Sequence, residues 1–595
     1  MLMVTSSKTQ FFSLITQLFS HVSKRRKFQF ALLLALSLVS SLAEIISLGA
    51  VGPFIGILTQ PEIVFASPVI TTFASQMGIE TAADMVMPLT VIFALAAILA
   101  GLLRLLLLWV GLRLGNVTGA DLGLEIFRRT LYQPYRIHVA RNSSEIISAI
   151  TQKVRAATDV LISGIAVFTS GILFLAIIIT LLWQDPMIAI VASLSFGVAY
   201  VLIAMQTSKR LAKNSEKIAT EQTHVVKALQ EGLGAIRDVL IEGTQSVYAD
   251  LYKGSIYSLM RASAENVYIN QAPRYVMEAL GLVLVAMFAL VLSSRTGGIQ
   301  GALPILAMLA LAAQRLLPLM QQLFGGWATL KGSLAAMHDV IDLLEQPVKD
   351  YDRQQTVSSV HLNKAIHFKN VGFRYTEETP WVLQGVDFAI EKGSRVGIVG
   401  ATGGGKSTLM DLLLGLLEPG YGSILIDGTP LEGAKVIAWQ QSLAHVPQQI
   451  FLSDGTIAEN IAFGTDPGQI DLERVRVAAE QANLAEFIES RPNAYQERIG
   501  ERGIRLSGGQ RQRIGIARAL YKRADVLIFD EATSSLDSET EKNIIRTIES
   551  LDHDFTTLII AHRISTLENC DQFLLLDNGK IRQNLSYQDL LERNQ

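Results

Sequence analysis

Cysteine is almost missing from this sequence, since Cys570 is the single one in 595 residues. A disulfide within the chain is therefore excluded, and Cys570 has no motif partner, so we interpret it as an inert side chain. Charged residues are also scarce, at 18% of the chain against 50% hydrophobic residues, which indicates membrane-spanning segments. A cleavable signal is not apparent either, because the apolar stretch after Lys24–Lys27 is too long and lacks a convincing cleavage site.

Whole segments within residues 1–330 lack charge, whereas the remainder has the composition of a soluble α/β protein. Six apolar stretches are each long enough to cross a hydrocarbon core of roughly 30 Å. They are 28–58, 86–116, 157–183, 186–206, 272–293 and 302–325. The sequence therefore predicts a membrane domain of six helices, which excludes a soluble protein acting on nucleic acid.

Basic residues gather on one side of these stretches. Lys24–Lys27 precede the first stretch, and the connections 117–156 and 207–271 are rich in Lys and Arg, whereas the opposite loops offer only Arg295. By the positive-inside rule, both chain ends are expected in the cytoplasm. Apolar residues at helical spacing over 11–22 predict an amphipathic elbow in the membrane interface, with a frayed tail as the alternative.

Ionisable residues inside the apolar stretches bear on the cargo. They are Glu44 in the first, Arg104 in the second, Arg274 and Glu278 in the fifth and Arg315 in the sixth. A charge at the bilayer centre costs about 2.5–3.5 kcal/mol, so it usually faces a partner or a wet cavity. If the three arginines share one cavity, they are expected to bind an anionic headgroup such as phosphate or pyrophosphate. Alternatively, Arg104 and Arg274 extend to the inner headgroups, and Glu278 pairs with Arg274 one helical turn away.

Residues 400–408 (GATGGGKST) fit the phosphate-binding pattern G-x-x-x-x-G-K-[ST]. Backbone N–H groups of such a loop surround the phosphates, the lysine reaches the β and γ oxygens, and the serine hydroxyl holds Mg²⁺. A strand predicted at Arg395–Val399 and a helix predicted at Leu409–Leu417 supply the required strand–loop–helix context. We therefore predict ATP and Mg²⁺ as cofactors, bound by Gly400, Thr402, Gly403, Gly404, Gly405, Lys406, Ser407 and Thr408.

A carboxylate pair follows another predicted strand, Val526–Phe529. Asp530 is placed to hold the Mg²⁺ coordination shell. Glu531 comes directly after it and is the natural base to polarise the attacking water. Asp-Glu pairs also occur on solvated loops, but the buried strand and the phosphate loop favour the catalytic interpretation.

The sequence LSGGQ at Leu506–Gln510 opens a helix predicted to run through Arg511–Leu520. Ser507 and the N–H groups of Gly508, Gly509 and Gln510 are expected to form an anion-binding helix N-terminus. One phosphate loop is already present, so a second such surface makes sense if it completes the site of another subunit.

Together these motifs resemble the ABC transporter ATPase, whose two copies sandwich two ATP molecules. With six apolar stretches ahead of one ATPase, the whole chain resembles an ABC exporter half-transporter. The resemblance implies an α-helical membrane domain followed by an α/β P-loop ATPase domain. We expect the elbow at 1–27, the membrane domain at 28–335, a linker at 336–365 and the ATPase at 366–595.

The resemblance also implies roles for further residues. Tyr375 is similar to the aromatic that stacks on adenine, Gln448 to the residue that senses Mg²⁺ and the membrane domain, and His562 to the switch histidine at the γ-phosphate. Glu497 with Ile499–Gly503 is similar to the X-loop. Ser534–Asp537 match the D-loop, in which Asp537 is expected to contribute to the nucleotide site. Short capped coupling helices are expected near Asn142–Glu145 and Glu242–Asp250.

The signature sequence and Glu531 are both intact, which favours a homodimer with two competent sites. Three stretches, Ser40–Leu58, Glu231–Ile241 and Pro273–Gly281, resemble bacterial lipid-linked-oligosaccharide flippases and polysaccharide exporters. The expected function is therefore ATP-driven flipping of a polyprenyl-pyrophosphate glycan across the inner membrane. A lipid or drug exporter of the same architecture is the first alternative, and a peptide exporter or an ATP-gated regulator is the second.

Overall fold

The computed structural model describes residues 13–59, 62, 65, 81, 83–184, 186–293, 298–348, 360–401, 403–530, 555–560, 567–582 and 587–593. The chain divides into two compact units, which are described separately. The helical unit consists of Met1–Gln133 and Arg141–Pro347, and the α/β unit of Pro134–Ala140 and Val348–Gln595.

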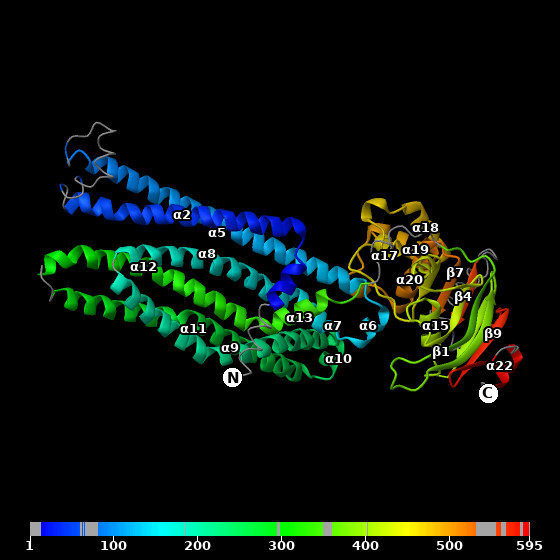
Figure 1. Ribbon diagram of the computed structural model, residues 1–595. Helices are drawn as coiled ribbons and strands as arrows, with labels where there is room; N and C mark the ends of the chain where they lie inside the picture. The colour runs from blue at the N-terminus through cyan, green and yellow to red at the C-terminus, as the bar shows by residue number, and fades with distance from the viewer. Residues whose placement is uncertain are drawn as a thin grey trace. The chain divides into compact units, whose positions relative to one another are not determined.

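Long helices build the helical unit (Figure 1). They are α2 (Lys24–Thr59), α5 (Val86–Leu131), α8 (Val154–Gln184), α9 (Pro186–Gly234), α11 (Gln245–Ser293) and α12 (Gly298–Gly332). Each predicted apolar stretch falls within one of these helices. Judged by length and composition, the described residues contain three candidate membrane spans, at Lys24–Ser47, Val86–Leu131 and Ser143–Ile179.

The elbow expected ahead of α2 is helical over the described residues 13–20. Leu18 is fully buried against Leu122 and Ile126 of α5, and Val22 is buried near Leu114 of the same helix. Protein therefore covers at least part of the apolar face that we expected to contact lipid. Phe11 and Phe12, which belong to the same predicted face, lie outside the described residues.

Short helices occupy the links between the long ones. The first is α7 (Ser143–Ser148), whose N-cap Asn142 accepts a hydrogen bond from the Ser144 N–H, as the sequence predicts. A π-helical turn, η1 (Ala149–Lys153), joins α7 to α8, and α10 (Ile236–Ile241) follows α9. The short helix predicted at Glu242–Asp250 is wrong. Gly243, which has left-handed backbone, ends the helical conformation after α10. The next helix, α11, begins at Gln245 and continues to Ser293.

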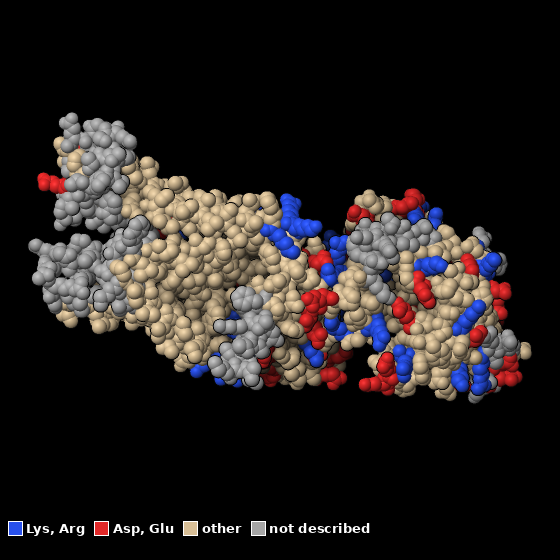
Figure 2. Space-filling view, in the orientation of Figure 1, with Lys and Arg blue, Asp and Glu red and all other residues tan. Residues whose placement is uncertain are grey.

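Charged side chains are scarce along most of the visible face of the helical unit (Figure 2). They gather at the end that carries α7, α10 and α13 (Leu334–Leu344). The last of these helices covers the first part of the segment expected as a linker. Exposed leucines elsewhere, for example Leu102, Leu105 and Leu108 of α5, suit a surface that faces lipid.

The α/β unit holds two sheets and their covering helices. Its strands are β1 (Ala365–Phe373), β2 (Leu383–Glu391), β3 (Arg395–Gly400), β4 (Tyr421–Ile426), β5 (Thr429–Pro430), β6 (Leu443–Val446), β7 (Val526–Asp530), β8 (Thr556–Ile560), β9 (Gln572–Asp577) and β10 (Lys580–Arg582). Its helices are α6 (Tyr135–Ala140), α15 (Lys406–Leu413), α16 (Ala434–Gln441), α17 (Ile457–Ile461), α18 (Leu472–Gln481), α19 (Ala485–Glu489), α20 (Gly508–Lys522) and α22 (Tyr587–Arg593). Among the described residues, 3₁₀ turns lie at Pro467–Gln469, Ala494–Gln496 and Glu501–Gly503.

The larger sheet has the strand order β10-β9-β3-β8-β7-β6, and the smaller one β2-β1-β4-β5. Strands β9, β3, β8, β7 and β6 run parallel, so their carboxyl ends share one edge of the sheet. Ligands of open parallel sheets bind outside this edge. The predicted combination of a long-helix membrane domain and an α/β domain is confirmed.

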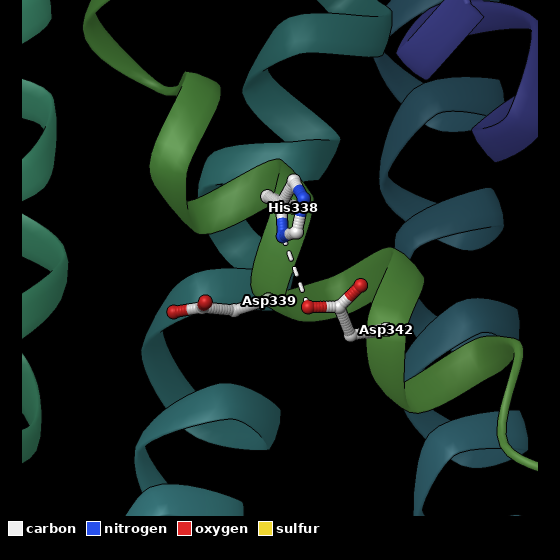
Figure 3. Close-up of side chains that lie close together, drawn as sticks. All are labelled: His338, Asp339 and Asp342. Atoms are coloured by element: carbon white, nitrogen blue, oxygen red, sulfur yellow. Dashed lines mark ion pairs between the residues drawn. The ribbon is translucent and has the colours of Figure 1, made fainter.

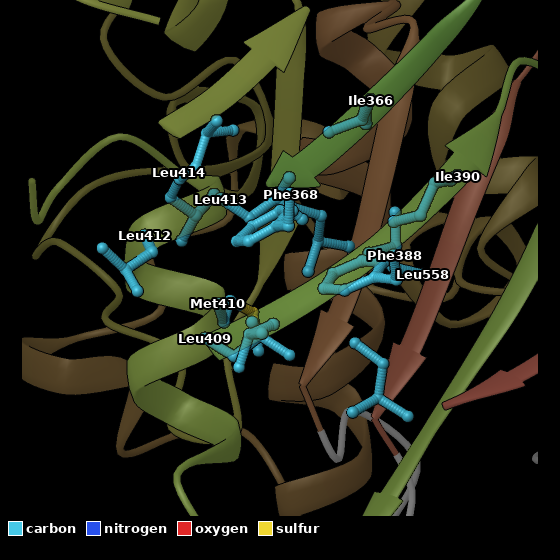
Figure 4. Close-up of a cluster of buried hydrophobic side chains, with 14 of the residues drawn as sticks. Ile366, Phe368, Phe388, Ile390, Leu409, Met410, Leu412, Leu413, Leu414 and Leu558 are labelled. Atoms are coloured by element: carbon cyan, nitrogen blue, oxygen red, sulfur yellow. The ribbon is translucent and has the colours of Figure 1, made fainter. Parts of the chain in front are cut away.

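A hydrophobic core lies between the sheets and α15 (Figure 4). Phe368 of β1 and Phe388 of β2 stack with their ring centroids 4.5 Å apart. Leu409, Met410 and Leu413 of α15 pack into the same core, all nearly fully buried. This packing fixes the first turn of α15, and therefore the loop before it, relative to the sheet.

Candidate functional site

The predicted phosphate loop connects β3 to α15. Gly400 ends the strand, and a Cβ atom there would lie 2.4 Å from the carbonyl oxygen of Leu576 on β9. Gly405 adopts φ +99° and a Cβ atom there would lie 3.0 Å from the Leu383 side chain. Only glycine satisfies both positions, because the first lacks space and the second needs left-handed backbone. The loop is therefore held close to β9 and β2 and turns sharply into the helix.

Lys406 is the first residue of α15 and is almost fully buried. Its Nζ donates hydrogen bonds to the carbonyl oxygens of Gly400 at 2.7 Å and of Ala401 at 3.2 Å. The ammonium group therefore points back into the loop, beside the first-turn N–H groups of α15, which have no partner within the helix. Ser407 and Thr408 follow in that first turn, whereas Thr402 lies outside the described residues. A cation and a helix N-terminus together suit a phosphate. α15 begins three residues earlier than predicted, because the loop residue Lys406 already belongs to it.

Tyr375 lies beside this turn. Its hydroxyl is 3.1 Å from the Thr408 Oγ1, and its ring meets that of Phe373 edge to face with centroids 5.1 Å apart. Two contacts therefore fix the ring next to the helix that carries the phosphate loop. The role of Tyr375 in stacking on adenine stays a prediction, and its position is compatible with it.

Two of the three residues predicted to hold Mg²⁺ lie at the ends of neighbouring parallel strands, and the third, Ser407, is in the first turn of α15. Asp530 is the last residue of β7, and Gln448 follows β6 by two residues and is exposed. Hydroxyl, amide and carboxylate oxygens from Ser407, Gln448 and Asp530 form the kind of hard-oxygen ligand set that Mg²⁺ prefers. The donor types and the shared sheet edge therefore fit the ion.

A further carboxyl group, Asp411 of α15, was missed in the sequence analysis. Burial and, as a smaller cause, the nearby Asp530 carboxylate together raise the pKa of Asp411 to about 6. The electrostatic interaction places one face of α15 next to the end of β7. Nothing in the sequence pattern distinguishes this aspartate, because its environment arises from the packing of the helix on the sheet.

We expect Asp411→Asn to stabilise the protein at neutral pH. The pKa of an aspartate in the unfolded chain is about 3.9. Because the pKa of Asp411 is higher in the folded state, the folded state holds this proton more tightly. The wild type therefore loses stability as the pH rises from about 4 to 6 and loses no more above that range. Asparagine cannot ionise and escapes this loss, which we put at about 1 kcal/mol for a partly buried carboxyl. Thermal unfolding in EDTA without nucleotide should show an advantage of the variant at pH 7.5 that shrinks towards pH 4.5. A constant difference would contradict the assignment.

The LSGGQ segment forms the start of α20, which confirms the predicted helix. Ser507 is the N-cap: its Oγ accepts a hydrogen bond from the Gln510 N–H at 3.2 Å, and the Gln510 Oε1 accepts one from the Ser507 N–H at 2.9 Å. This capping box leaves the N–H groups of Gly508 and Gly509 at the helix end. Ser507 forms no hydrogen bond with the phosphate loop among the described residues. Its contact with ATP bound to a second copy stays a prediction.

The predicted catalytic residues Glu531 and His562 lie outside the described residues, as does the predicted nucleotide-binding residue Asp537. The sequence places Glu531 directly after Asp530, at the carboxyl end of β7. The X-loop residue Glu497 is described and accepts a hydrogen bond from the Asn493 side chain at 2.9 Å.

The structure gives Arg104 and Arg274 separate carboxylate partners. The Arg104 Nη2 is 3.5 Å from the Glu44 Oε1, which joins α5 to α2. The Arg274 Nε is 2.7 Å from the Glu278 Oε1 one turn further along α11, as the alternative prediction has it. The side chain of Arg315 in α12 lies outside the described part. A cavity shared by all three arginines therefore stays a prediction.

A polar pocket of about 560 Å³ lies in the helical unit and was also missed from the sequence. Its walls come from α7, η1, α9 and α13 and include Lys153, Glu216 and Asp339. The cluster of His338, Asp339 and Asp342 lies on α13, with its ligand atoms within 4.8 Å of one another (Figure 3). The Lys153 ammonium already neutralises Asp339 at 2.5 Å. We therefore assign no metal ion to this cluster.

Comparisons with known proteins agree with this geometry. The chain matches the family model of the ABC transporter over residues 383–534, and that of the ABC transporter transmembrane region over residues 31–315. The first range begins at β2 and ends just past the Asp530–Glu531 pair. The second begins in the second turn of α2 and ends about halfway along α12.

Relatives of similar length are known. An ATP-dependent lipid A-core flippase of Saccharophagus degradans is 35% identical over 480 residues, which cover 80% of this chain and 79% of the relative. A protein with the same description from Chromohalobacter salexigens is 32% identical over 485 residues, covering 80% and 81%. The solved structure of a bacterial Atm1-family ABC exporter with ATP bound aligns with a TM-score of 0.77 at 26% identity, covering 96% of each chain.

Proposed function

Because the chain belongs to the ABC transporter family, as an exporter half-transporter that couples ATP hydrolysis to transport across a membrane, we propose that it flips a phosphorylated glycolipid between the two leaflets. The observation that carries this proposal is the match to lipid A-core flippases along about 80% of the chain. The similarity to the solved Atm1-family exporter supports a transport cycle driven by ATP, but a shared fold does not identify the cargo.

Two glycolipids fit the proposal. Lipid A with its core sugars is the cargo named for the relatives. A polyprenyl-pyrophosphate glycan is the cargo that the resemblance of Ser40–Leu58 and two further stretches suggests. Both combine acyl or prenyl chains, sugars and phosphate, so an arginine within the apolar helices suits either. A hydrophobic drug or a neutral lipid is the alternative cargo.

The proposed assembly is a homodimer in the bacterial inner membrane, with six spans per chain and both chain ends in the cytoplasm. Lys406 and the α15 N-terminus bind the phosphates of ATP in one copy, and Ser507 of the other copy completes the site. Ser407, Gln448 and Asp530 would hold Mg²⁺, which neutralises phosphate charge when bound. Glu531 polarises the attacking water and His562 contacts the γ-phosphate. Closure of the ATPase dimer turns the cavity outward, and hydrolysis resets it.

The proposal is tested in proteoliposomes that contain either lipid A-core or a polyprenyl-pyrophosphate glycan. Wild type is expected to flip at least one of them when ATP is added, and Lys406→Ala, which lacks the phosphate-binding ammonium group, is expected to flip neither. The lipid that moves identifies the cargo. Hydrolysis stimulated by an apolar drug, with both glycolipids left in place, would overturn the proposal in favour of the drug exporter.

A further inference from the structure

The apolar stretches of two helices in the helical unit each contain one charged residue, and the fold brings these two residues together. Residues 28–59 carry Glu44 as their only charge, and residues 86–112 carry Arg104. In the structure Glu44 of α2 and Arg104 of α5 form an ion pair, with the Nη2 and Oε1 atoms 3.5 Å apart. Both residues lie within candidate membrane spans, where a lone charge is costly. Each of these two apolar runs contains a single charge, and the two charges are opposite in sign and form an ion pair. This arrangement indicates a function for the pair.

The two partners are exposed to different degrees. The Glu44 side chain is 6% exposed, whereas that of Arg104 is 52% exposed. Glu44 lies on a buried polar face of α2, on which Ser37, Ser40, Ser41 and Ser47 are also buried. These residues recur every three or four positions and therefore share one side of the helix. The carboxylate is thus fixed inside the protein, while about half of the Arg104 side chain is exposed.

The pair also lies far from the ends of the helices. Arg26 and Asp121 form a second ion pair between α2 and α5, with Nε and Oδ2 2.8 Å apart. Glu44 is 18 residues beyond Arg26 along α2, as the numbering shows, which corresponds to ~27 Å of helix. An unpaired arginine extends its long side chain towards the nearest headgroups. A fixed carboxylate opposes that movement and keeps the guanidinium at this depth.

We propose that Glu44 is a positioning residue that holds Arg104 within the membrane domain, so that the open side of its guanidinium binds a phosphate of the transported lipid. The inference rests on the proposed function, because it assigns an anionic headgroup to the site. A guanidinium has five N–H donors in a fixed fork. One nitrogen faces Glu44, and the remaining donors suit a phosphate oxygen pair. Arg274 differs, because its partner Glu278 is on the same helix and is itself 45% exposed.

The test measures ATP hydrolysis by the full-length protein in phosphatidylcholine nanodiscs with increasing amounts of lipid A, which carries phosphate groups. Arg104→Ala and Glu44→Gln are each expected to raise the lipid A concentration for half-maximal stimulation about tenfold, with a smaller effect on the maximal rate. The double variant is expected to be no worse than either single one, because the two residues act as a unit. Glu44→Asp, which keeps the charge, should return towards wild type.

Asp121→Asn provides the matched control, since it breaks the other ion pair between the same two helices. It should leave the half-maximal concentration unchanged. A wild-type response from Glu44→Gln, or effects that multiply to about a hundredfold in the double variant, would overturn the inference while the proposed function stands. If neither lipid A nor a polyprenyl-pyrophosphate glycan stimulates ATP hydrolysis by the wild type, both the proposed function and this inference are contradicted.

If Glu44→Gln fails to fold, the double variant Glu44→Arg with Arg104→Glu, which exchanges the two charges, tests the inference instead. It retains an ion pair between α2 and α5, so thermal unfolding should return towards wild type. The cation then lies on the buried face of α2, and the lipid A concentration for half-maximal stimulation should stay at least tenfold raised. A wild-type lipid response from the exchanged protein would show that the position of the cation is irrelevant.

Discussion

Glu531→Gln is expected to slow ATP hydrolysis by a factor of about 10² to 10⁴, the range typical of a lost general base. Glutamine is nearly isosteric with glutamate, so the phosphate loop and the Mg²⁺ ligands stay in place and ATP binding should persist. The protein should then hold ATP in a closed dimer, and lipid movement should stop after the first turn of the cycle. Single-turnover hydrolysis of radiolabelled ATP, combined with retention of nucleotide after gel filtration, measures both effects.

A suitable control is Glu473→Gln, which removes an exposed carboxylate in the first turn of α18. Its turnover should equal that of the wild type. Asp530→Asn should behave differently from Glu531→Gln, because loss of a metal ligand weakens the binding of Mg²⁺ as well as catalysis. Hydrolysis at the wild-type rate in Glu531→Gln would refute its assignment as the base.

The nucleotide-binding elements could be predicted from the sequence because their signals are local. The strand–loop–helix order around Gly400–Lys406, the strand before Asp530 and the helix opened by Ser507 all appear in the structure as expected. The ends of elements were less accurate. The helix expected at Leu409–Leu417 is α15, which ends at Leu413, and the left-handed Gly415 follows its C-cap.

Contacts between distant segments were not predictable to the same extent. The sequence shows Glu44 and Arg104 as isolated charges, but only the packing of α2 on α5 identifies them as partners. The raised pKa of Asp411 likewise depends on how α15 meets β7. A periodic pattern identifies the buried face of a helix without identifying what covers it. These features therefore depend on packing between segments that are distant in the sequence.

Gly119→Leu is expected to have the largest effect on assembly of the helical unit. Gly111, Gly115, Gly119 and Gly123 recur every four residues and form one face of α5. A Cβ atom would lie 2.3 Å from the Ile162 Cγ1 at Gly115, and 1.9 Å from the Thr158 Oγ1 at Gly119. These glycines let α5 and α8 approach closely, as small residues do between membrane helices.

A leucine at position 119 must separate the two helices, and we expect a loss of about 3 kcal/mol or failure to assemble. Helix propensity opposes this effect by only about 1 kcal/mol. Gly123→Ala is the matched control on the same face: its Cβ would lie 3.6 Å from the Val154 Cγ1, an ordinary contact, so it should stabilise or leave the protein unchanged. Thermal unfolding of the purified protein measures both variants. Because the clash at Gly119 is with one side chain, Gly119→Ala should be destabilising alone and partly rescued by Thr158→Ala. An absence of rescue would show that the α5–α8 spacing has another cause.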